Sequence, residues 1–442
     1  MPKHRRKDRP PSCRNNNQEH GAGGDDNDDY QDDAMSVMSV ISNASDNRAT
    51  DGSDECNGAL TAQENYEEKM STCIEGISQK NSKGRIESLK SLKSGLCKQY
   101  SFSYLSDRYV TVSDGLEKCL KRGCVEEQLV AADCICVLFI QIACSPAKDE
   151  LLKSVSPILK VLINDNAVSL QTRCSCAEAL GLCVFLAVEE PEDIYETMGL
   201  FEQHFKLSFK SMNNNNAQQQ LAHPCSQLHN SCLGAWALLF TLLSDKFVLS
   251  YAQKFIILVS SMLSSESMEL RITAGETIAL MFEAGRDVSE DFDDCFEANK
   301  LEELCKKLKE LSTECNKYRA KKDKKVQKAS FRDILKAVQD GEFGSSEIKI
   351  NIQESLYLES WVQKTHYDQL CRVLTSGMNA HLQENPLIRD IFSLGEPINF
   401  DQHNNQRNSK LDKVVYKAAY KERTKYRSKQ RSKKSMNCYG GD

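Results

Sequence analysis

The segment Arg173–Leu182, RCSCAEALGL, and the segment Arg271–Leu280, RITAGETIAL, share one pattern. In each, an arginine is followed five residues later by a glutamate. Small residues precede that glutamate, and apolar residues lie two and four positions after it. Weaker copies are centred on Lys90, Asp133 and Trp236. Such self-similarity along a chain is typical of repeat architectures, in which each copy is one structural unit.

We take five positions as equivalent: Lys90, Asp133, Glu178, Trp236 and Glu276. The spacings between successive positions are 43, 45, 58 and 40 residues. Three spacings fall near the ~40–47-residue period of armadillo and HEAT repeats. The long one contains the insert Asn213–Gln220, which is most simply a surface loop. One helical hairpin cannot bury its apolar stripe alone, so neighbouring hairpins stack into a continuous core.

We therefore expect an all-α fold: an armadillo/HEAT-like helical-repeat solenoid, then a small helical C-terminal region and a basic tail helix. The acids at the repeat position, Asp133, Glu178 and Glu276, are expected to form pairs inside the solenoid, with Arg173 and Arg271 as candidate partners. A structural role of this kind is favoured over acid–base chemistry.

Composition divides the 442 residues into five regions. Residues 1–58 are expected to form a disordered acidic and Ser-rich tail, because their low hydrophobicity cannot offset the entropy of ordering. Residues 59–316 form the armadillo-like repeats, 317–330 a basic linker, 331–400 a helical C-terminal region and 401–442 a basic tail. In the helical region, Asn385 is placed to cap a helix that begins at Pro386, and Gly395 with Pro397 ends it.

The composition indicates a soluble intracellular protein. The first ten residues are charged and no apolar run follows them, so we expect no signal peptide and no contact with a membrane. The 19 cysteines are expected to be free thiols that pack as small hydrophobic side chains. We expect the protein in both the cytoplasm and the nucleus.

Charge is strongly separated along the chain. Residues 317–442 carry 25 lysines and arginines against 15 acids, so this part is +10 while the whole chain is −6. The remainder is therefore −16, and such asymmetry suggests a basic binding end joined to an acidic body.

No motif for catalysis is present among the common ones: the chain has no Walker A loop, no G-x-G-x-x-G, no H-E-x-x-H and no nucleophile elbow. We therefore predict a protein that is not an enzyme, with no cofactor and no small-molecule substrate. One cluster, His223, Cys225, His229 and Cys232, holds four potential zinc ligands, but its spacing does not match usual structural zinc sites. A loop followed by core residues is the favoured interpretation, and no metal site is predicted.

The basic tail is the most informative feature. Between residues 410 and 434 there are eleven basic residues and two acids, and the sequence after Tyr426 is polar on every side. A helix with no face to bury needs an anionic environment, or the segment stays disordered in solution. Phosphate binding is favoured over a nuclear-targeting patch, with tyrosines to stack on bases and cations to neutralise phosphates. The predicted nucleic-acid-binding residues are Lys417, Tyr420, Lys421, Arg423, Lys425, Tyr426, Arg427, Lys429, Arg431, Lys433 and Lys434, together with Lys321, Lys322, Lys324 and Lys325.

The chain resembles the interferon-related developmental regulator family from about residue 60 to 434. The resemblance is carried by Arg271–Glu283, by Tyr318–Lys325 with Phe331–Lys336, by Trp361–Asp368, by His381–Asn385 with Phe392–Pro397, and by Ala418–Lys429. The N-terminal tail and the Asn/Gln insert depart from the family pattern.

The resemblance implies an armadillo-like helical fold without enzymatic activity, and two kinds of work. One is association with translationally inactive ribosomes, with the basic C-terminal helix in space lined by ribosomal RNA. The other is transcriptional co-regulation through histone-deacetylase corepressor complexes during differentiation. The basic tail favours the first role, so ribosomes and ribosomal RNA are the expected partners, with corepressor complexes as the alternative.

Overall fold

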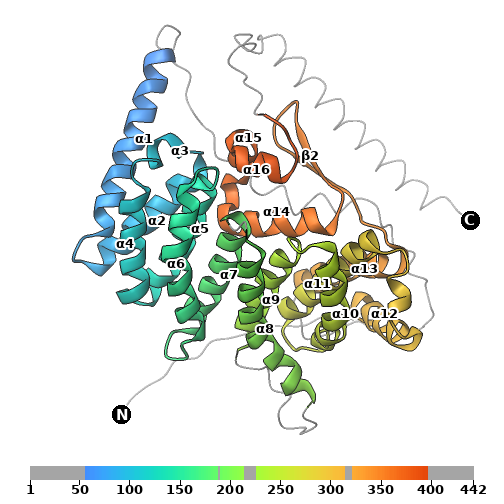
Figure 1. Cartoon of the computed structure of the whole chain (residues 1–442). Helices are drawn as coiled ribbons and strands as arrows, with labels where there is room; N and C mark the ends of the chain where they lie inside the picture. Colours follow the sequence, from blue (N-terminus) through green and yellow to red (C-terminus); the bar gives the residue numbers. More distant parts are fainter. Residues whose placement is uncertain (1–54, 188–189, 214–224, 314–320, 397–442) are drawn as a thin grey trace, which may run out of the picture. The chain divides into compact units, whose positions relative to one another are not determined.

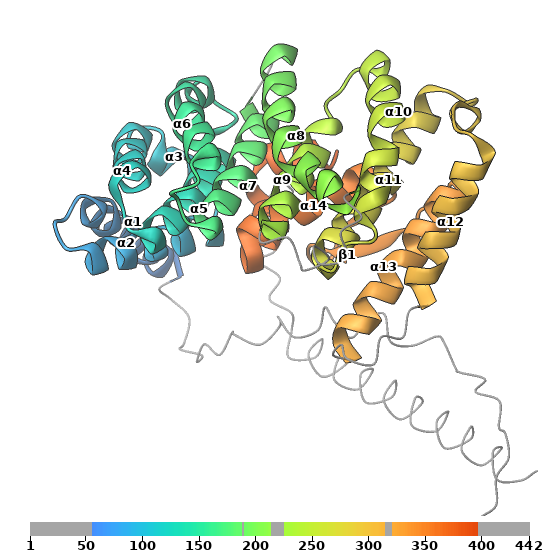
Figure 2. The ribbon, with the colours of Figure 1, turned by 90° about the horizontal axis from the view of Figure 1, so that it is seen from below.

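The computed structural model describes residues 55–187, 190–213, 225–313 and 321–396 (Figure 1). Their helices form pairs, and each pair contributes one helix to an outer layer and one to an inner layer (Figure 2). The outer helices are α1 (Glu55–Ile77), α4 (Tyr109–Arg122), α6 (Ala147–Asn164), α8 (Pro191–Asn213), α10 (Asp245–Met262) and α12 (Ala298–Thr313). The inner helices are α2 (Ser82–Lys98), α5 (Val125–Ile142), α7 (Leu170–Ala187), α9 (Ser226–Phe240), α11 (Met268–Val288) and α13 (Lys321–Asp340).

The all-α repeat fold expected from the sequence is confirmed. The five repeat positions lie on five successive inner helices, α2, α5, α7, α9 and α11, and each of these packs on the next. The short helix α3 (Phe102–Leu105) precedes α4, and the 3-10 turn η1 (Asp293–Cys295) lies between α11 and α12. The sequence pattern therefore marks one layer of the solenoid.

Local capping signals begin several inner helices. The side chain of Asn81 accepts a hydrogen bond from the backbone N–H of Lys83 at the start of α2. Ser267 accepts one from Leu270 at the start of α11. Both satisfy N–H groups that have no partner within the helix, which stabilises a helix by about 1 kcal/mol.

The arginines of the repeat pattern do not pair with the acids five residues later. Arg173 donates instead to the carbonyl of Ile163, at the end of α6, and to Asn166. Arg271 donates to the carbonyls of Ser265 and Glu266, just after α10. Side chains five residues apart on a helix point about 140° apart, so an arginine cannot reach that acid. Each arginine satisfies carbonyls at the end of the preceding outer helix.

The structure differs from the basic linker expected at residues 317–330. From Lys321 onward the chain is helical, and α12 with α13 form a further pair of the solenoid. Gln327 is buried in α13 and donates to the carbonyl of Leu311 at the end of α12, just as Gln128 in α5 donates to Leu120 at the end of α4. Residues 317–320 lie outside the described residues.

Burial of one face stabilises α13 despite its charge. Phe331 and Ile334 are fully buried, and both lie close to Gly275 of α11. A methyl group added at Gly275 would come within 2.8 Å of Ile334. Burial of the apolar side chains between positions 331 and 338 therefore stabilises all of α13, including its lysine-rich first half.

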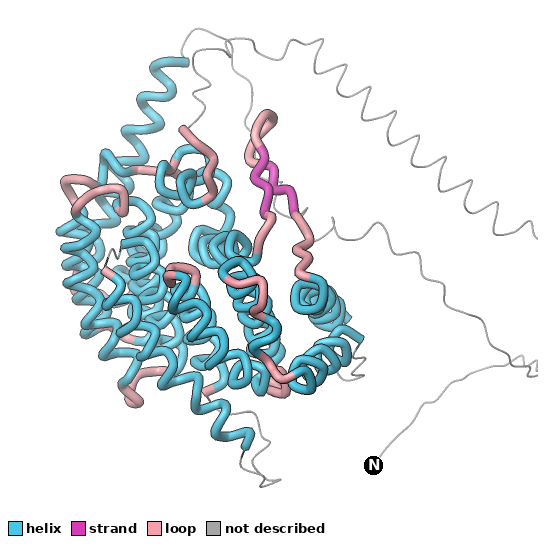
Figure 3. Tube along the Cα trace, turned by 45° about the vertical axis from the view of Figure 1, so that its right-hand side comes forward, coloured by secondary structure: helices cyan, strands magenta, loops and turns pink. Residues whose placement is uncertain are grey.

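The region 331–400 was expected to be helical, but the structure shows that part of it is not. It contains an antiparallel hairpin of β1 (Ser346–Lys349) and β2 (Ser355–Leu358), drawn in magenta in Figure 3. Ile348 pairs with Leu356, and both side chains are buried, while the residues beside them in the strands are more exposed. This alternation has the period of two that marks a strand with one buried face.

Helices α14 (Trp361–Leu374), α15 (Met378–Glu384) and α16 (Pro386–Ile391) complete the described chain, with the 3-10 turn η2 (Thr375–Gly377) after α14. The capping prediction at Asn385 is confirmed, because its side chain accepts a hydrogen bond from Leu387 and Pro386 begins α16. Gly395 has a φ of +72°, a conformation that favours glycine.

The cysteines of the described residues are free thiols. Many pack in the core as expected: Cys134, Cys176 and Cys183 are fully buried. Burial raises the pKa of the Cys176 thiol to about 12, so it remains protonated at neutral pH.

A candidate basic interface and an occupied inner face

The predicted lysines of the 321–325 segment lie in the first two turns of α13. Lys322 and Lys325 are exposed, and Lys324 is half-buried. Two further exposed lysines, Lys306 and Lys309, lie on the partner helix α12. Sequence reasoning missed these two, because alternating acids in α12 hide them in the local charge balance.

Lysines at the start of a helix oppose the helix dipole, whose N-terminal end carries a partial positive charge. Each costs a few tenths of a kcal/mol up to about 1 kcal/mol in that position. The first turn of α13 contains one compensating acid, Asp323. The cluster is therefore not explained by helix stability, and it leaves a surface that attracts anions.

The remaining predicted nucleic-acid-binding residues, from Lys417 to Lys434, lie outside the described residues. So does His223 of the potential zinc cluster. Of the other three, Cys225 precedes α9, while His229 and Cys232 are buried within it. Within the described ranges, no three His, Cys, Asp or Glu side chains gather in a way that could hold a metal ion.

Helix α14 lies across the inner layer, where it contacts α2, α5, α9 and α11 (Figure 1). Two of the repeat acids meet it there. Glu276 of α11 pairs with Lys364 at 2.8 Å, and Glu178 of α7 pairs with Arg372 at 3.2 Å. The third acid, Asp133, pairs with Lys93 of α2. The expected pairing within the solenoid thus exists for Asp133, whereas Glu178 and Glu276 pair with cations of α14, and none of the three pairs with a repeat arginine.

The pair at Lys364 is held in a polar, largely enclosed place. Burial alone would lower the pKa of Lys364, but the carboxylates of Glu276 and Asp368 outweigh it and raise the pKa. Lys364 is therefore charged at all physiological pH values. It joins α14 to α11 as a permanent ion pair.

The N-terminus of α14 is capped by the solenoid. The carboxylate of Glu283 in α11 accepts hydrogen bonds from the backbone N–H groups of Trp361, at 2.8 Å, and Val362, at 3.1 Å. Burial raises the pKa of Glu283, and these two hydrogen bonds oppose that shift. A carboxylate at this end also interacts favourably with the helix dipole.

Apolar contacts and a close backbone approach complete the attachment. Trp361, Leu370 and Leu374 are almost fully buried. In η2, a Cβ atom at Gly377 would lie 1.7 Å from the carbonyl oxygen of Cys97 in α2, so only glycine fits there. Helix α14 is therefore an integral part of the packed core.

A family model described as interferon-related developmental regulator matches residues 37–339, which is more than half of the chain. A second model, described as interferon-related protein conserved region, matches residues 385–435. The chain belongs to the interferon-related developmental regulator family. The family resemblance of the sequence analysis is confirmed.

Relatives in this family match over most of their length. The chain is 36% identical to interferon-related developmental regulator 1 of Mus musculus over 84% of this chain and 81% of that protein. It is 37% identical to interferon-related developmental regulator 2 of Mus musculus, over 77% of this chain and 75% of that protein. An engineered protein of known structure superposes with a TM-score of 0.37 and 13% identity, covering 62% of this chain and 98% of that protein.

The limits of the family models agree with the structure. The first model ends one residue before α13 does, so the interferon-related developmental regulator repeat region includes α13 with the other helix pairs. The second begins at Asn385, the cap of α16, and continues through the basic segment. The capped helix α16 and the basic segment thus belong to one conserved unit of the family.

Arg389 anchors the end of the described chain within that conserved unit. Its guanidinium is 1% exposed and forms a two-pronged ion pair with Glu354, which precedes β2. It also donates to the backbone carbonyls of Leu382, Leu394, Gly395 and Glu396. Since these carbonyls include those of the last three described residues, Arg389 fixes the end of the described chain.

One described helix, α7, is long and apolar enough to span a membrane by length and composition. About two thirds of it, 67%, is buried inside the protein, between α5 and α9. Its place in the inner layer accounts for its apolar composition.

Proposed function

We propose that this protein is a non-catalytic regulator of gene expression that binds ribosomes through ribosomal RNA and represses or tunes translation. The basic segment Lys417–Lys434 would contact the RNA phosphates, and the lysines at the start of α13 would add to that surface. The observation that carries the proposal is charge separation: residues 410–434 hold eleven cations and two acids, whereas residues 1–316 carry a net charge of −16.

Four carboxylates of the inner face support this proposal, because they are already ion-paired or hydrogen-bonded within the protein. Glu178, Glu276 and Glu283 are bound by α14, and Asp133 is bound by Lys93. A basic tail that folded back onto the same molecule would have to compete with these contacts. Ribosomal RNA offers a far denser array of anions.

The regulatory role fits the family of developmental regulators to which the chain belongs. A protein that acts on ribosomes would be found in the cytoplasm, and the basic tail would also direct part of it to the nucleus. Catalysis is not part of the proposal, because the sequence carries none of the common catalytic motifs.

The test is sucrose-gradient sedimentation of cell extracts that contain the full chain or a chain ending at His403. The full chain should sediment with ribosomes, and RNase treatment should abolish this. The shortened chain should remain at the top of the gradient. Sedimentation of the shortened chain with ribosomes would contradict the proposal.

A matched control separates this tail effect from a general loss of positive charge. Three exposed lysines on outer helices, Lys118, Lys153 and Lys246, are replaced by glutamine in the full chain. That variant should sediment as the unaltered protein does. Binding to purified ribosomes should also weaken with salt, by about 0.7–0.9 in log K per phosphate contact for each tenfold rise in salt.

A second candidate function is a nuclear scaffold that acts through histone-deacetylase corepressor complexes. It is favoured by an open polar hollow on the inner layer, whose chemistry suits a protein segment better than a nucleic acid. Purified corepressor complexes should then be captured equally by the full chain and by the chain ending at His403. Capture that depends on the tail would count against it.

A further inference from the structure

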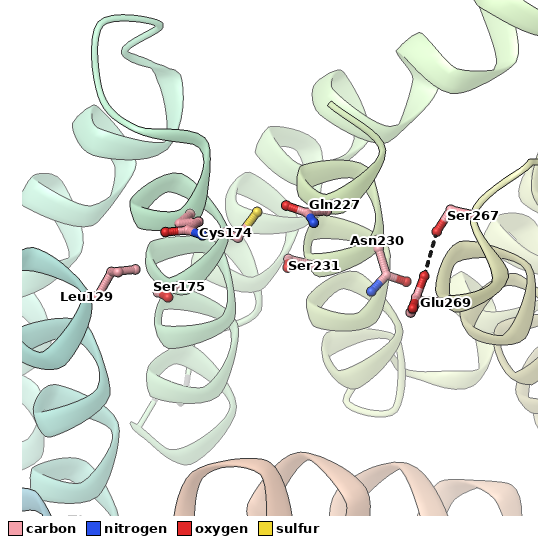
Figure 4. Close-up of a pocket in the computed structure, with 9 residues that line it drawn as sticks. Leu129, Cys174, Ser175, Gln227, Asn230, Ser231, Ser267 and Glu269 are labelled. Carbon is pink, nitrogen blue, oxygen red and sulfur yellow. Dashed lines mark hydrogen bonds between the residues drawn. The ribbon is translucent and has the colours of Figure 1, made fainter. Parts of the chain in front are cut away.

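A hollow of about 580 Å³ opens on the inner layer, beside α14 (Figure 4). Its walls come from four successive inner helices and the caps before them. The lining residues are Leu129 of α5, Gln171, Cys174 and Ser175 of α7, Gln227, Asn230 and Ser231 of α9, and Ser267 and Glu269 at the start of α11. Ser231 connects it to α14, because it donates to Glu178, which pairs with Arg372.

Three carboxamide side chains in this hollow have no hydrogen-bond partner among the described residues: Gln171, Gln227 and Asn230. Other carboxamides of the inner layer are used within the protein. Gln141 donates to Leu96, and Gln327 donates to Leu311. Gln141 and Gln327 are thus hydrogen-bonded in the packing of the solenoid, whereas the three carboxamides above line the hollow.

The charge of the hollow is negative. Glu269 is exposed and is the one charged side chain among the lining residues, and the hydroxyl of Ser267 donates to it at 3.0 Å. No lysine or arginine lines the hollow. The carboxylate of Glu269 would attract a basic side chain and would repel a phosphate placed against it.

The shape and the polar groups fit an extended polypeptide. A carboxamide offers two donors and one acceptor in one plane, so it can bond the N–H and C=O of a peptide main chain at the same time. A helical ligand would already satisfy these groups internally. Packed helices lie about 8–10 Å apart, so walls from four successive helices extend over roughly 25–30 Å, the length of about eight extended residues.

We propose that this hollow is a binding site for an extended segment of a partner protein, held through its main chain by Gln171, Gln227 and Asn230. A lysine or arginine of that segment pairs with Glu269. The site is separate from the basic segment and goes beyond ribosome binding, since it binds protein whether or not the tail binds RNA. It names the surface on which the second candidate function would rest.

The test uses the full chain and two mixtures of fluorescein-labelled, N-acetylated octapeptides in fluorescence polarisation. One mixture has lysine fixed at its fourth position, the other glutamate, and the other seven positions are randomised without cysteine. The lysine mixture should bind at least tenfold more tightly. The double variant Gln227→Ala, Asn230→Ala should lose at least tenfold of that binding, and Glu269→Lys should reverse the preference between the mixtures.

Two controls make the test specific. Gln253→Ala removes an exposed carboxamide from the outer helix α10 and should bind as the unaltered chain does. A lysine mixture with N-methylated amides at positions three to five should bind at least tenfold more weakly, because its main chain can no longer donate there. Circular dichroism melting checks that each variant is folded, and Gln171→Ala, at an exposed position, provides a second variant should the double one unfold.

Three results would overturn the proposal. The first is equal binding of the lysine and glutamate mixtures. The second is full binding by the folded double variant. The third is loss of binding to a labelled twelve-nucleotide oligouridylate in the double variant without loss of peptide binding, which would assign the hollow to nucleic acid.

Discussion

Replacing Leu370 by alanine tests whether α14 is a fixed part of the core. Leu370 is fully buried, with 0% of its surface exposed, between α14 and the inner layer. Removing a leucine side chain to Cβ at such a position costs about 2–5 kcal/mol, the sum of lost transfer free energy and the cavity left behind. Leu207 on α8 is 43% exposed, and its replacement by alanine should cost less than about 1 kcal/mol.

Hydrogen exchange followed by mass spectrometry measures this cost locally. Peptides that cover α14 should be strongly protected in the unaltered protein. In Leu370→Ala their exchange should rise between about 30-fold and several-thousand-fold, since each 1.4 kcal/mol changes an equilibrium tenfold.

Peptides from α1, which lies in the outer layer, should change much less. The reasoning is refuted if α14 exchanges freely in the unaltered chain. It is also refuted if Leu370→Ala and Leu207→Ala give the same profile.

Three further predictions concern pH, backbone packing and charge. Burial lowers the pKa of His366 to about 4, while the unfolded chain titrates near 6.5. This imidazole should therefore lower the free energy of unfolding by up to about 3 kcal/mol as pH drops from 6.5 to 4, and in urea unfolding His366→Gln should show a smaller fall than the unaltered chain. Gly377→Ala should lower the free energy of unfolding by at least about 1 kcal/mol and so lower the thermal midpoint. Gly199→Ala should not lower the midpoint, because nothing lies within 4 Å of a Cβ atom added there. Finally, four lysines are exchanged for glutamine, namely Lys321, Lys322, Lys324 and Lys325. This variant should bind purified ribosomal RNA more weakly and with a flatter salt dependence, and its unfolding midpoint should not fall.

For the repeat arginines, the local sequence pattern does not reveal which groups they bind in the tertiary structure. Arg173 and Arg271 lie in the first turn of their inner helices. Their partners could not be read from the pattern, because a helix turns an i, i+5 pair to different sides. The carbonyls that they satisfy belong to the end of the preceding helix, whose position depends on the turn between the two helices.

The last helix pair was concealed by its charge. Lysines at Lys321–Lys325 outweigh apolar residues in that stretch, so composition alone indicates a linker. The stripe from Phe331 to Val338 is what stabilises α13, because a helix begun by buried contacts extends into flanking residues at little cost. The hairpin at residues 346–358 was missed for a related reason, since each strand has only four residues.

The candidate sites differ in how much of them a sequence can reveal. A basic tail is visible directly, because charge density needs no fold. The hollow at Gln171, Gln227 and Asn230 is not, since Gln171 lies more than 50 positions before the other two and none belongs to a recognisable motif. Only the stacking of successive inner helices brings these amides to one space.

By itself, the sequence determined the helical repeats, the positions that recur in them, and the separation of acidic body from basic end. These follow from the recurrence of a short pattern and from the charge balance of each region, which can be read without knowing the fold. Only the tertiary structure decided that α14 covers the inner layer and takes Glu178 and Glu276 as its partners. Such pairings join residues 88 or more positions apart, and their geometry is set by how every helix pair between them is stacked.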